Sequence, residues 1–278
     1  MTKKDNKVIN ALTKQHSDLK KYIKSTPDLG KLLYQGKSLK FHSSDLGLKK
    51  LLMAYNKRKY DEISLNHGLK RLQLFKKSKV IWHYPSIKYK IRFKDKTIKM
   101  LETKSQKIKI EALNAIRSLK KFPDNDTLVN KKGLWSYFPF YNKNGSKIKS
   151  AHKLCPTISK ILSKLDLNTL MGFSFLSALA KKSKISAHCG STSLRKRYHY
   201  PIIIPEKKRC KIRVGKKWIF WRENKAFSFY DAVEHEVINN SKDLRLLLIF
   251  DVWSDHLPKS IKRFLKKNNK ILNYGIVS

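Results

Sequence analysis

The spacing of hydrophobic residues predicts helices in the first part of the chain and a strand after them. Residues 46–55 and 69–75 place leucines and aromatic residues at the intervals of a helix face. Residues 88–94 change to strict alternation of apolar and basic side chains, which predicts a strand with one basic face. Asp95-Lys96 is the expected turn of this strand.

A second helical pattern follows at residues 109–120, and Pro123 with its polar neighbours up to Asp126 then breaks it. A soft boundary near residue 105 divides the chain into two regions. Residues 1–105 are expected to form a basic, mostly helical N-terminal region. Residues 106–278 are expected to form the main domain.

From about residue 133 the chain becomes rich in aromatic and β-forming residues. Residues 133–145 read as a strand with an Asn-Gly turn, and residues 157–166 read as a helix. Further strands are predicted at 173–180, 185–190, 196–204, 210–214, 217–221, 226–230 and 244–252. Many short strands separated by turn residues favour a sandwich or barrel over a βαβ sheet. Residues 256–267 are expected to form a basic surface helix.

Composition adds a large positive charge to this picture. The 278 residues hold 63 Lys and Arg against 20 Asp and Glu, a formal net charge of +43, and 41% of the residues are hydrophobic. That apolar fraction is enough to build a core and argues against a disordered chain. Because 52 of the basic residues are lysines spread along the chain, the charge by itself does not outline a nucleic-acid-binding stripe.

Targeting and redox signals are weak. No apolar run reaches the roughly 18–20 residues of a membrane-spanning helix, and no apolar stretch follows the basic N-terminus as in a signal peptide. The expected location is therefore cytoplasmic. Cys155, Cys189 and Cys210 are odd in number and contain no C-x-x-C pair, which argues against a disulfide framework or a structural zinc site.

Candidate chemistry gathers in the β-rich region. His188 and His235 stand in strand-edge contexts, and neutral imidazole is a common ligand of transition metals. Arg245 begins a strongly apolar run, where a buried guanidinium requires an anionic partner. Arg197 and His199 share one face of their strand because side chains alternate with a period of two.

These residues belong to motifs that resemble a known family. The motifs are GLWSYF at 133–138, SAHCGSTSLRKRYHYPIIIP at 186–205, the turn at 221–225 and FYDAVEHEVINNSKDLRLLLIFDVW at 229–253. Residues 133–253 resemble the aspartyl/asparaginyl β-hydroxylase family of Fe(II)/2-oxoglutarate-dependent dioxygenases. The resemblance implies a mainly β fold with flanking helices, whose core is a double-stranded β-helix of the jelly-roll or cupin-like type.

The resemblance also implies roles for the metal site. His188 and His235 correspond to the iron ligands, and Arg245 corresponds to the arginine that binds the distal carboxylate of 2-oxoglutarate. The implied cofactor is Fe(II), with 2-oxoglutarate and O2 as co-substrates.

Four more positions correspond to co-substrate contacts in the family. Arg197 and His199 match two such contacts. Ser177 stands where the family has a serine hydroxyl on the co-substrate, and Trp135 matches a tryptophan that lines the same pocket.

Several positions depart from the family pattern. Gly190 stands where many Fe(II) oxygenases have a carboxylate ligand, which leaves a two-histidine iron site, halogenation or loss of activity as alternatives. Asn224 replaces a glycine, and asparagine tolerates the positive φ that such a turn needs. Ala187 replaces a proline, and Ser254-Asp255 replaces a histidine-proline pair.

Two neighbouring residues receive structural interpretations. Cys189 is expected to point away from the iron side and to pack. Asp231 is interpreted as a turn residue or as a carboxylate that supports the site without binding the metal, and the alternative is that it supplies a carboxylate near the iron.

The function implied by the resemblance is hydroxylation of a carbon, the β-carbon of Asp or Asn, in a peptide or protein substrate that is expected to be acidic. One alternative is hydroxylation of the acyl chain of lipid A, which a second branch of the family performs. Another is a non-catalytic derivative of the fold that binds nucleic acid or another polyanion, with steep salt dependence. The oligomeric state and the role of residues 1–105 stay open.

Overall fold

The computed structural model describes most of the chain after residue 89. The described residues are 90–123, 128–142, 145–169, 172–188, 194–206, 208–231 and 233–255, together with 257, 259, 262, 263 and 266. The helices predicted at 46–55 and 69–75 lie outside these residues. Among the described residues in 256–267, those at 259, 262, 263 and 266 are helical.

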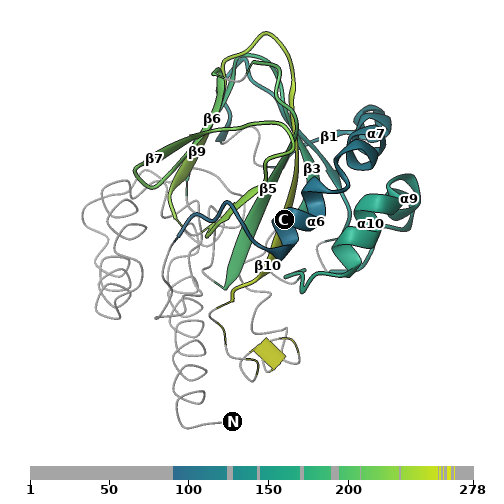
Figure 1. Cartoon of the computed structure of the whole chain (residues 1–278). Helices are drawn as coiled ribbons and strands as arrows, with labels where there is room; N and C mark the ends of the chain where they lie inside the picture. Colours follow the sequence, from purple (N-terminus) through teal and green to yellow (C-terminus); the bar gives the residue numbers. More distant parts are fainter. Residues whose placement is uncertain are drawn as a thin grey trace, which may run out of the picture.

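Two antiparallel sheets form the body of the protein (Figure 1). The larger sheet has the order β1-β2-β3-β10-β5-β8, and the smaller one has the order β4-β9-β6-β7. The strands of the larger sheet are β1 (Lys120–Lys121), β2 (Trp135–Pro139), β3 (Ser174–Leu179), β5 (Arg195–Ile203), β8 (Phe227–Phe229) and β10 (Arg245–Trp253). Those of the smaller sheet are β4 (Ser183–His188), β6 (Cys210–Val214), β7 (Lys217–Phe220) and β9 (His235–Asn239).

This strand order confirms the double-stranded β-helix prediction. From β3 onwards, consecutive strands are divided between the two sheets, and the last strand, β10, lies between β3 and β5. That arrangement is the double Greek key of a jelly roll. All nine residues of β10 are buried, because the strand is central in its sheet and both of its faces are covered.

The two faces of the larger sheet pack against different layers. Residues of β10 that point outward, such as Leu246 and Phe250, join a cluster with residues of the helices. These helices are α6 (Lys96–Glu102), α7 (Ser105–Ala115), α9 (Lys149–Leu154) and α10 (Pro156–Ser163), which lie together on one side of the sheet (Figure 1). Residues that point inward, such as Leu247 and Ile249, pack between the sheets.

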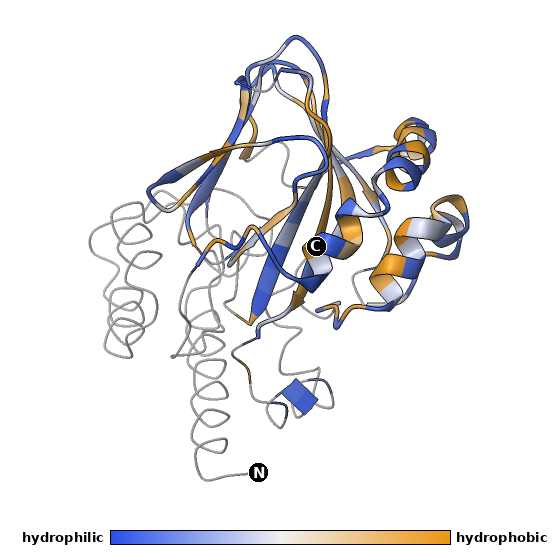
Figure 2. Cartoon of the chain, viewed as in Figure 1, coloured by the Kyte–Doolittle hydropathy of each residue, from blue (hydrophilic) through white to orange (hydrophobic). Residues whose placement is uncertain are grey.

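Each of these helices carries both hydrophobic and hydrophilic residues (Figure 2). Glu111 of α7 holds α10 in place, because its carboxylate accepts hydrogen bonds from the backbone N–H groups of Thr157 and Ile158 at 2.7 and 2.9 Å. These N–H groups have no partner inside their own helix. Among the described residues, no helix is long and apolar enough to cross a membrane.

The strand predicted at 88–94 is wrong where the structure describes it. Residues 90–94 make a single bridge, between Arg92 and Ser228 of β8. The expected turn at Asp95-Lys96 is instead the start of α6, where the Asp95 side chain accepts a hydrogen bond from the Ile98 N–H at 2.8 Å. An aspartate N-cap satisfies a donor that the first helical turn leaves open, so the chain enters a helix here.

The packing of α6 bears on the two-region division of the chain. Ile98 and Leu101 of α6 are buried in the same cluster as the outward face of β10. The end of the predicted N-terminal region therefore packs against the β domain. The rest of that region, up to residue 89, lies outside the described residues.

Candidate active site

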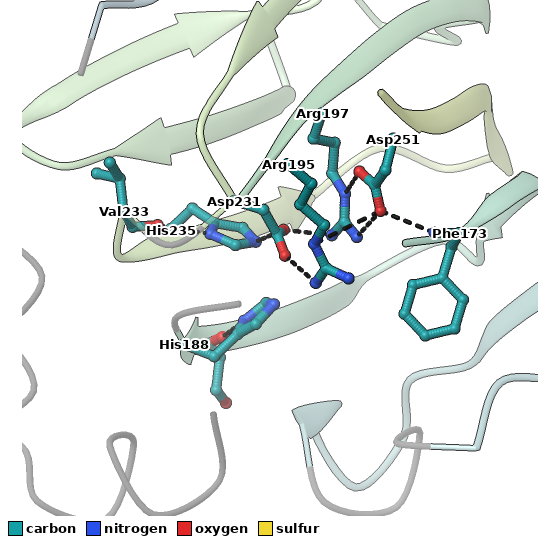
Figure 3. Close-up of polar contacts among 9 residues, drawn as sticks. Phe173, His188, Arg195, Arg197, Asp231, Val233, His235 and Asp251 are labelled. Atoms are coloured by element: carbon teal, nitrogen blue, oxygen red, sulfur yellow. Dashed lines mark hydrogen bonds and ion pairs between the residues drawn. The ribbon is translucent and has the colours of Figure 1, made fainter. Parts of the chain in front are cut away.

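His188 and His235 lie next to each other on adjacent strands of the smaller sheet (Figure 3). They are partners in the register of β4 and β9, and their ring centroids are 4.2 Å apart. The Nδ1 atom of His188 lies 2.7 Å from the Ser186 carbonyl, and that of His235 lies 2.8 Å from the Val233 carbonyl. Because a carbonyl only accepts, both Nδ1 atoms carry the proton, and Nε2 is the coordinating atom of each ring.

His235 is held in its neutral form. Burial, together with the neighbouring His188, lowers the pKa of His235 to about 3. A metal binds the neutral imidazole, so this ring needs to lose no proton near neutral pH. The described residues contain no group of three or more histidine, cysteine, aspartate or glutamate side chains with metal-binding geometry. Among the described residues, the site therefore offers two imidazoles as metal ligands. Cys189 and Gly190 lie outside the described residues.

A buried charge cluster adjoins the histidine pair (Figure 3). Asp231 forms ion pairs with Arg195 and Arg197, and its Oδ1 lies 3.6 Å from Nε2 of His235. Arg197 also forms a two-pronged pair with Asp251, with both contacts at 2.8 Å. Burial alone would raise the pKa of Asp231, but Arg197 and Arg195 hold it well below its usual range. Asp231 is thus a fixed carboxylate anion beside the imidazoles.

The side chain of Arg245 is buried between the two sheets. Its Nη1 lies 3.3 Å from the Ser177 hydroxyl, and its guanidinium stands 5.1 Å from the ring centre of Trp221. The indole N–H of Trp135 donates to the same hydroxyl at 3.0 Å. The structure thus brings together Arg245, Ser177 and Trp135, as the family resemblance implies.

The guanidinium of Arg245 has no anionic partner in the part of the chain that the structure describes. Its Nε has no hydrogen-bond acceptor there, and no carboxylate forms an ion pair with it. Burial lowers the pKa of Arg245 to about 9. A buried cation of this kind is costly unless an anion binds it, and the planar guanidinium matches a carboxylate.

His199 lies between the two parts of the site. Burial lowers its pKa well below the usual value, and the charges of Arg197 and Arg245 lower it further. Its Nδ1 has no hydrogen-bond partner among the described residues, and its ring stacks near Trp221 at 6.0 Å between centroids. The neutral ring of His199 can therefore donate or accept a hydrogen bond between the histidine pair and Arg245.

Two residues of the site were not among those singled out from the sequence. Trp221 was read only as part of a turn, although it lies against Arg245. Arg195 shares the inward face of β5 with Arg197, and the alternation of that strand could have indicated it. The expected turn at Asn224 is present, with φ at 61° and the Asn224 Oδ1 accepting from the Tyr200 hydroxyl.

The donor set fits a divalent metal and a dicarboxylate. Two imidazoles with their Nε2 atoms as ligands suit iron, and a buried arginine beside a serine hydroxyl suits a carboxylate. The family model described as aspartyl/asparaginyl beta-hydroxylase matches residues 102–255, which is more than half of the chain. The chain belongs to the aspartyl/asparaginyl β-hydroxylase family. The matched segment extends beyond the motifs at 133–253 in both directions.

Relatives of this β-hydroxylase family member include animal and bacterial proteins. The aspartyl/asparaginyl beta-hydroxylase of Mus musculus is 32% identical over 171 residues, which cover 60% of this chain and 23% of the mouse protein. The ornithine lipid ester-linked acyl 2-hydroxylase of Rhizobium tropici is 32% identical over 108 residues, covering 38% of this chain and 37% of that protein. The chain thus matches about a quarter of the length of the mouse relative.

Solved structures resemble the chain more distantly. A 2OG-Fe(II) oxygenase family oxidoreductase from Burkholderia pseudomallei is 11% identical, with a TM-score of 0.38, and the match covers 61% of this chain and 94% of that one. The fold assignment rests on the strand order described above.

Proposed function

We propose that this protein is an Fe(II)- and 2-oxoglutarate-dependent dioxygenase that hydroxylates the β-carbon of Asp or Asn in a peptide or protein. The observation that carries the proposal is the buried guanidinium of Arg245, which no described carboxylate neutralises. A dicarboxylate co-substrate would supply the missing anion. Membership of the β-hydroxylase family supports the reaction type.

Each residue of the site has a part in this proposal. His188 and His235 would hold the metal, with their Nε2 atoms as ligands and their Nδ1 atoms fixed by backbone carbonyls. Arg245 and Ser177 would bind the distal carboxylate of 2-oxoglutarate. When bound, iron and 2-oxoglutarate supply the activation of O2 and the oxidising power for hydroxylation.

The surrounding residues hold the polar groups of the site in place. The ring of Trp221 covers one side of the Arg245 guanidinium, and Trp135 holds the Ser177 hydroxyl in position. Asp231 accepts from Arg195 and sits beside His235, so that a carboxylate and an imidazole are fixed near each other before substrate arrives. Preorganised polar groups of this kind need little rearrangement during a reaction.

The test is turnover with defined components. Incubation with Fe(II), 2-oxoglutarate, O2 and peptides that contain Asp or Asn should yield succinate and a product that is about 16 Da heavier, from the one added oxygen atom. His188→Ala, His235→Ala and Arg245→Ala should abolish both. Parent-like turnover in all three variants, or no 2-oxoglutarate binding by the parent protein, would refute the proposal.

Hydroxylation of a lipid acyl chain is the second candidate. It is favoured by the 32% identity to the Rhizobium tropici acyl 2-hydroxylase over 108 residues. Competition between an acidic Asp-containing peptide and an acylated lipid in the same assay separates the two. A heavier product from the lipid alone would replace the peptide proposal.

A further inference from the structure

The hairpin of β6 and β7 ends beside the histidine pair. In the smaller sheet, one row of paired residues runs from His188 to His235, Val214 and Lys217. With neighbouring strands about 4.8 Å apart, the backbone of Lys217 lies roughly 14 Å from that of His188. The loop of the hairpin takes a positive φ of 58° at Gly215, whose N–H donates to the Glu234 carbonyl at 2.8 Å.

The outer edge of β7 is open in the part of the chain that the structure describes. β7 is the last strand of its sheet and pairs only with β6 there, on the side of the molecule away from α7 and α10 (Figure 1). The Trp221 N–H donates to Cys210 of β6, so the alternating pattern directs the backbone groups of Lys217 and Ile219 to β6 as well. The backbone groups of Trp218 and Phe220 therefore point outward.

The same two residues also expose their side chains. Trp218 is 38% exposed and Phe220 is 48% exposed, and the ammonium group of Lys211 stands 4.5 and 5.8 Å from their ring centres. Lysines alone are a common protection of a short edge strand against aggregation. Half-exposed aromatic rings instead favour association with another chain, so their presence at this edge indicates a binding surface.

The charge of this surface is positive. Among the described residues, no carboxylate lies within ion-pair distance of Lys211, Lys216 or Lys217, whereas Arg213 of the same hairpin is paired with Glu234 and Glu236. The ammonium of Lys217 stands 5.3 Å from the ring centre of the exposed Phe93. An anionic partner would complement these lysines.

We propose that the edge of β7, with Lys211, Lys217, Trp218 and Phe220, binds an extended acidic segment of the polypeptide substrate as an added strand. This inference rests on the proposed function for the identity of the substrate. An added strand would satisfy the outward backbone groups, and its acidic side chains would meet the lysines. It would lie about 19 Å from His188, so the docked segment should be separated by about six residues from the hydroxylated residue.

Two other anionic partners fit less well. A nucleic acid would stack its bases on exposed rings, but the Lys211 ammonium already stands over Trp218 and Phe220. A lipid surface would accept the rings and lysines but would leave the outward N–H and C=O groups without partners. Only a polypeptide uses the charges, the rings and the backbone edge together.

The binding test uses fluorescence anisotropy and a labelled 12-residue peptide of alternating Glu and Thr. Lys211→Glu/Lys217→Glu should weaken binding at least about tenfold, which corresponds to the loss of roughly 1.4 kcal/mol. Lys153→Glu/Lys160→Glu changes the net charge equally on exposed positions of α9 and α10, and it should change the affinity less than about twofold. Equal weakening in both variants would overturn the proposal.

The ligand itself provides a test that cannot unfold the protein. Two further peptides carry N-methyl groups on alternate residues, in opposite registers. Because only alternate N–H groups of an added strand face β7, one peptide should lose most of its affinity and the other should bind as before. Equal binding of both, or tighter Lys211-dependent binding of oligouridylate or phosphatidylserine vesicles, would overturn strand addition.

The same measurement separates this inference from the proposed function. Arg245→Ala should bind the Glu/Thr peptide like the parent protein, because Arg245 is buried between the sheets and not at the edge of β7. Binding of the Glu/Thr peptide, together with no hydroxylation of any peptide that contains Asp or Asn, would refute the catalytic proposal alone. Hydroxylation of peptides with no dependence on Lys211 and Lys217 would refute the docking proposal alone.

Discussion

Replacing Arg245 with methionine should make the ligand-free protein more stable while removing its response to 2-oxoglutarate. The side chain is buried, and no described carboxylate neutralises it. An apolar side chain of similar length fits the same space without the cost of burying a charge. Such replacements of buried charges commonly stabilise a protein by about 1–4 kcal/mol.

The size of the gain follows from the contacts of Arg245. Burial lowers its pKa to about 9, which corresponds to a penalty on the order of 5 kcal/mol. The variant loses the cation–π contact with Trp221 and the hydrogen bond to Ser177, which together offset about 2 kcal/mol. The remaining gain of about 3 kcal/mol should raise Tm by roughly 6–12 °C.

The co-substrate should stabilise the parent protein more than the Arg245→Met variant. At a concentration of 100 times its Kd, 2-oxoglutarate with Mn(II) in place of iron should stabilise the parent by about 2.7 kcal/mol, or roughly 5–10 °C. Loss of the charge pair costs at least about 2 kcal/mol of affinity, so the gain in Arg245→Met falls below about 1 kcal/mol.

Thermal denaturation followed by circular dichroism measures both effects. Arg213→Met is the matched control, because Arg213 is paired with Glu234 and Glu236 away from the pocket. It should lower Tm, since it leaves the buried Glu234 without this cation, and it should keep the response to 2-oxoglutarate. If Arg245→Met lowers Tm as Arg213→Met does, or keeps the full response, the reasoning about an unneutralised buried cation is wrong.

Three further predictions concern other buried polar groups. Burial lowers the pKa of His235 to about 3, so below pH 6.5 the unfolded chain takes up a proton that the folded protein does not. Urea denaturation with EDTA should therefore show about 2 kcal/mol of stability lost between pH 7.5 and pH 5, and His235→Phe should lose correspondingly less; identical pH profiles would contradict this. Asp251→Asn breaks the buried pair with Arg197 and should cost about 3 kcal/mol at pH 7.5, and a cost below about 1 kcal/mol would show that the pair is dispensable. Glu111→Gln leaves one N–H at the start of α10 without a strong acceptor and should cost about 1 kcal/mol by the same measurement, whereas an unchanged midpoint would assign no capping role to Glu111.

The sequence was most informative where side chains repeat with a simple period. The strands from 173 to 252 alternate or are wholly apolar, and the structure has strands in the same places. β9 is absent from the predicted strands, because it places the polar His235 and Asn239 on its buried face. A pattern based on hydrophobicity fails when polar residues point inward, and at β9 the inward histidine belongs to the candidate site.

Local hydrogen bonding explains the wrong prediction at 88–94. Alternation in that segment reflects lysines in solvent, and the described residues 90–94 are held by one bridge before Asp95 caps α6. Long-range pairing explains why the sequence did not predict the ion pairs of the buried charge cluster. Arg195, Asp231 and Asp251 lie far apart in the chain and meet only in the folded sheets, so one sequence alone did not indicate their partners.

The central position of β10 has a consequence for the order of folding. β3 and β5 are not joined to each other until β10 is inserted between them, and β10 pairs with β3 residues about 70 positions earlier in the chain. Contacts of such long range form slowly, and open strand edges aggregate in the meantime. During synthesis on the ribosome, the larger sheet therefore stays incomplete until Trp253 has emerged, and the pocket of Arg245 is among the last parts of the protein to form.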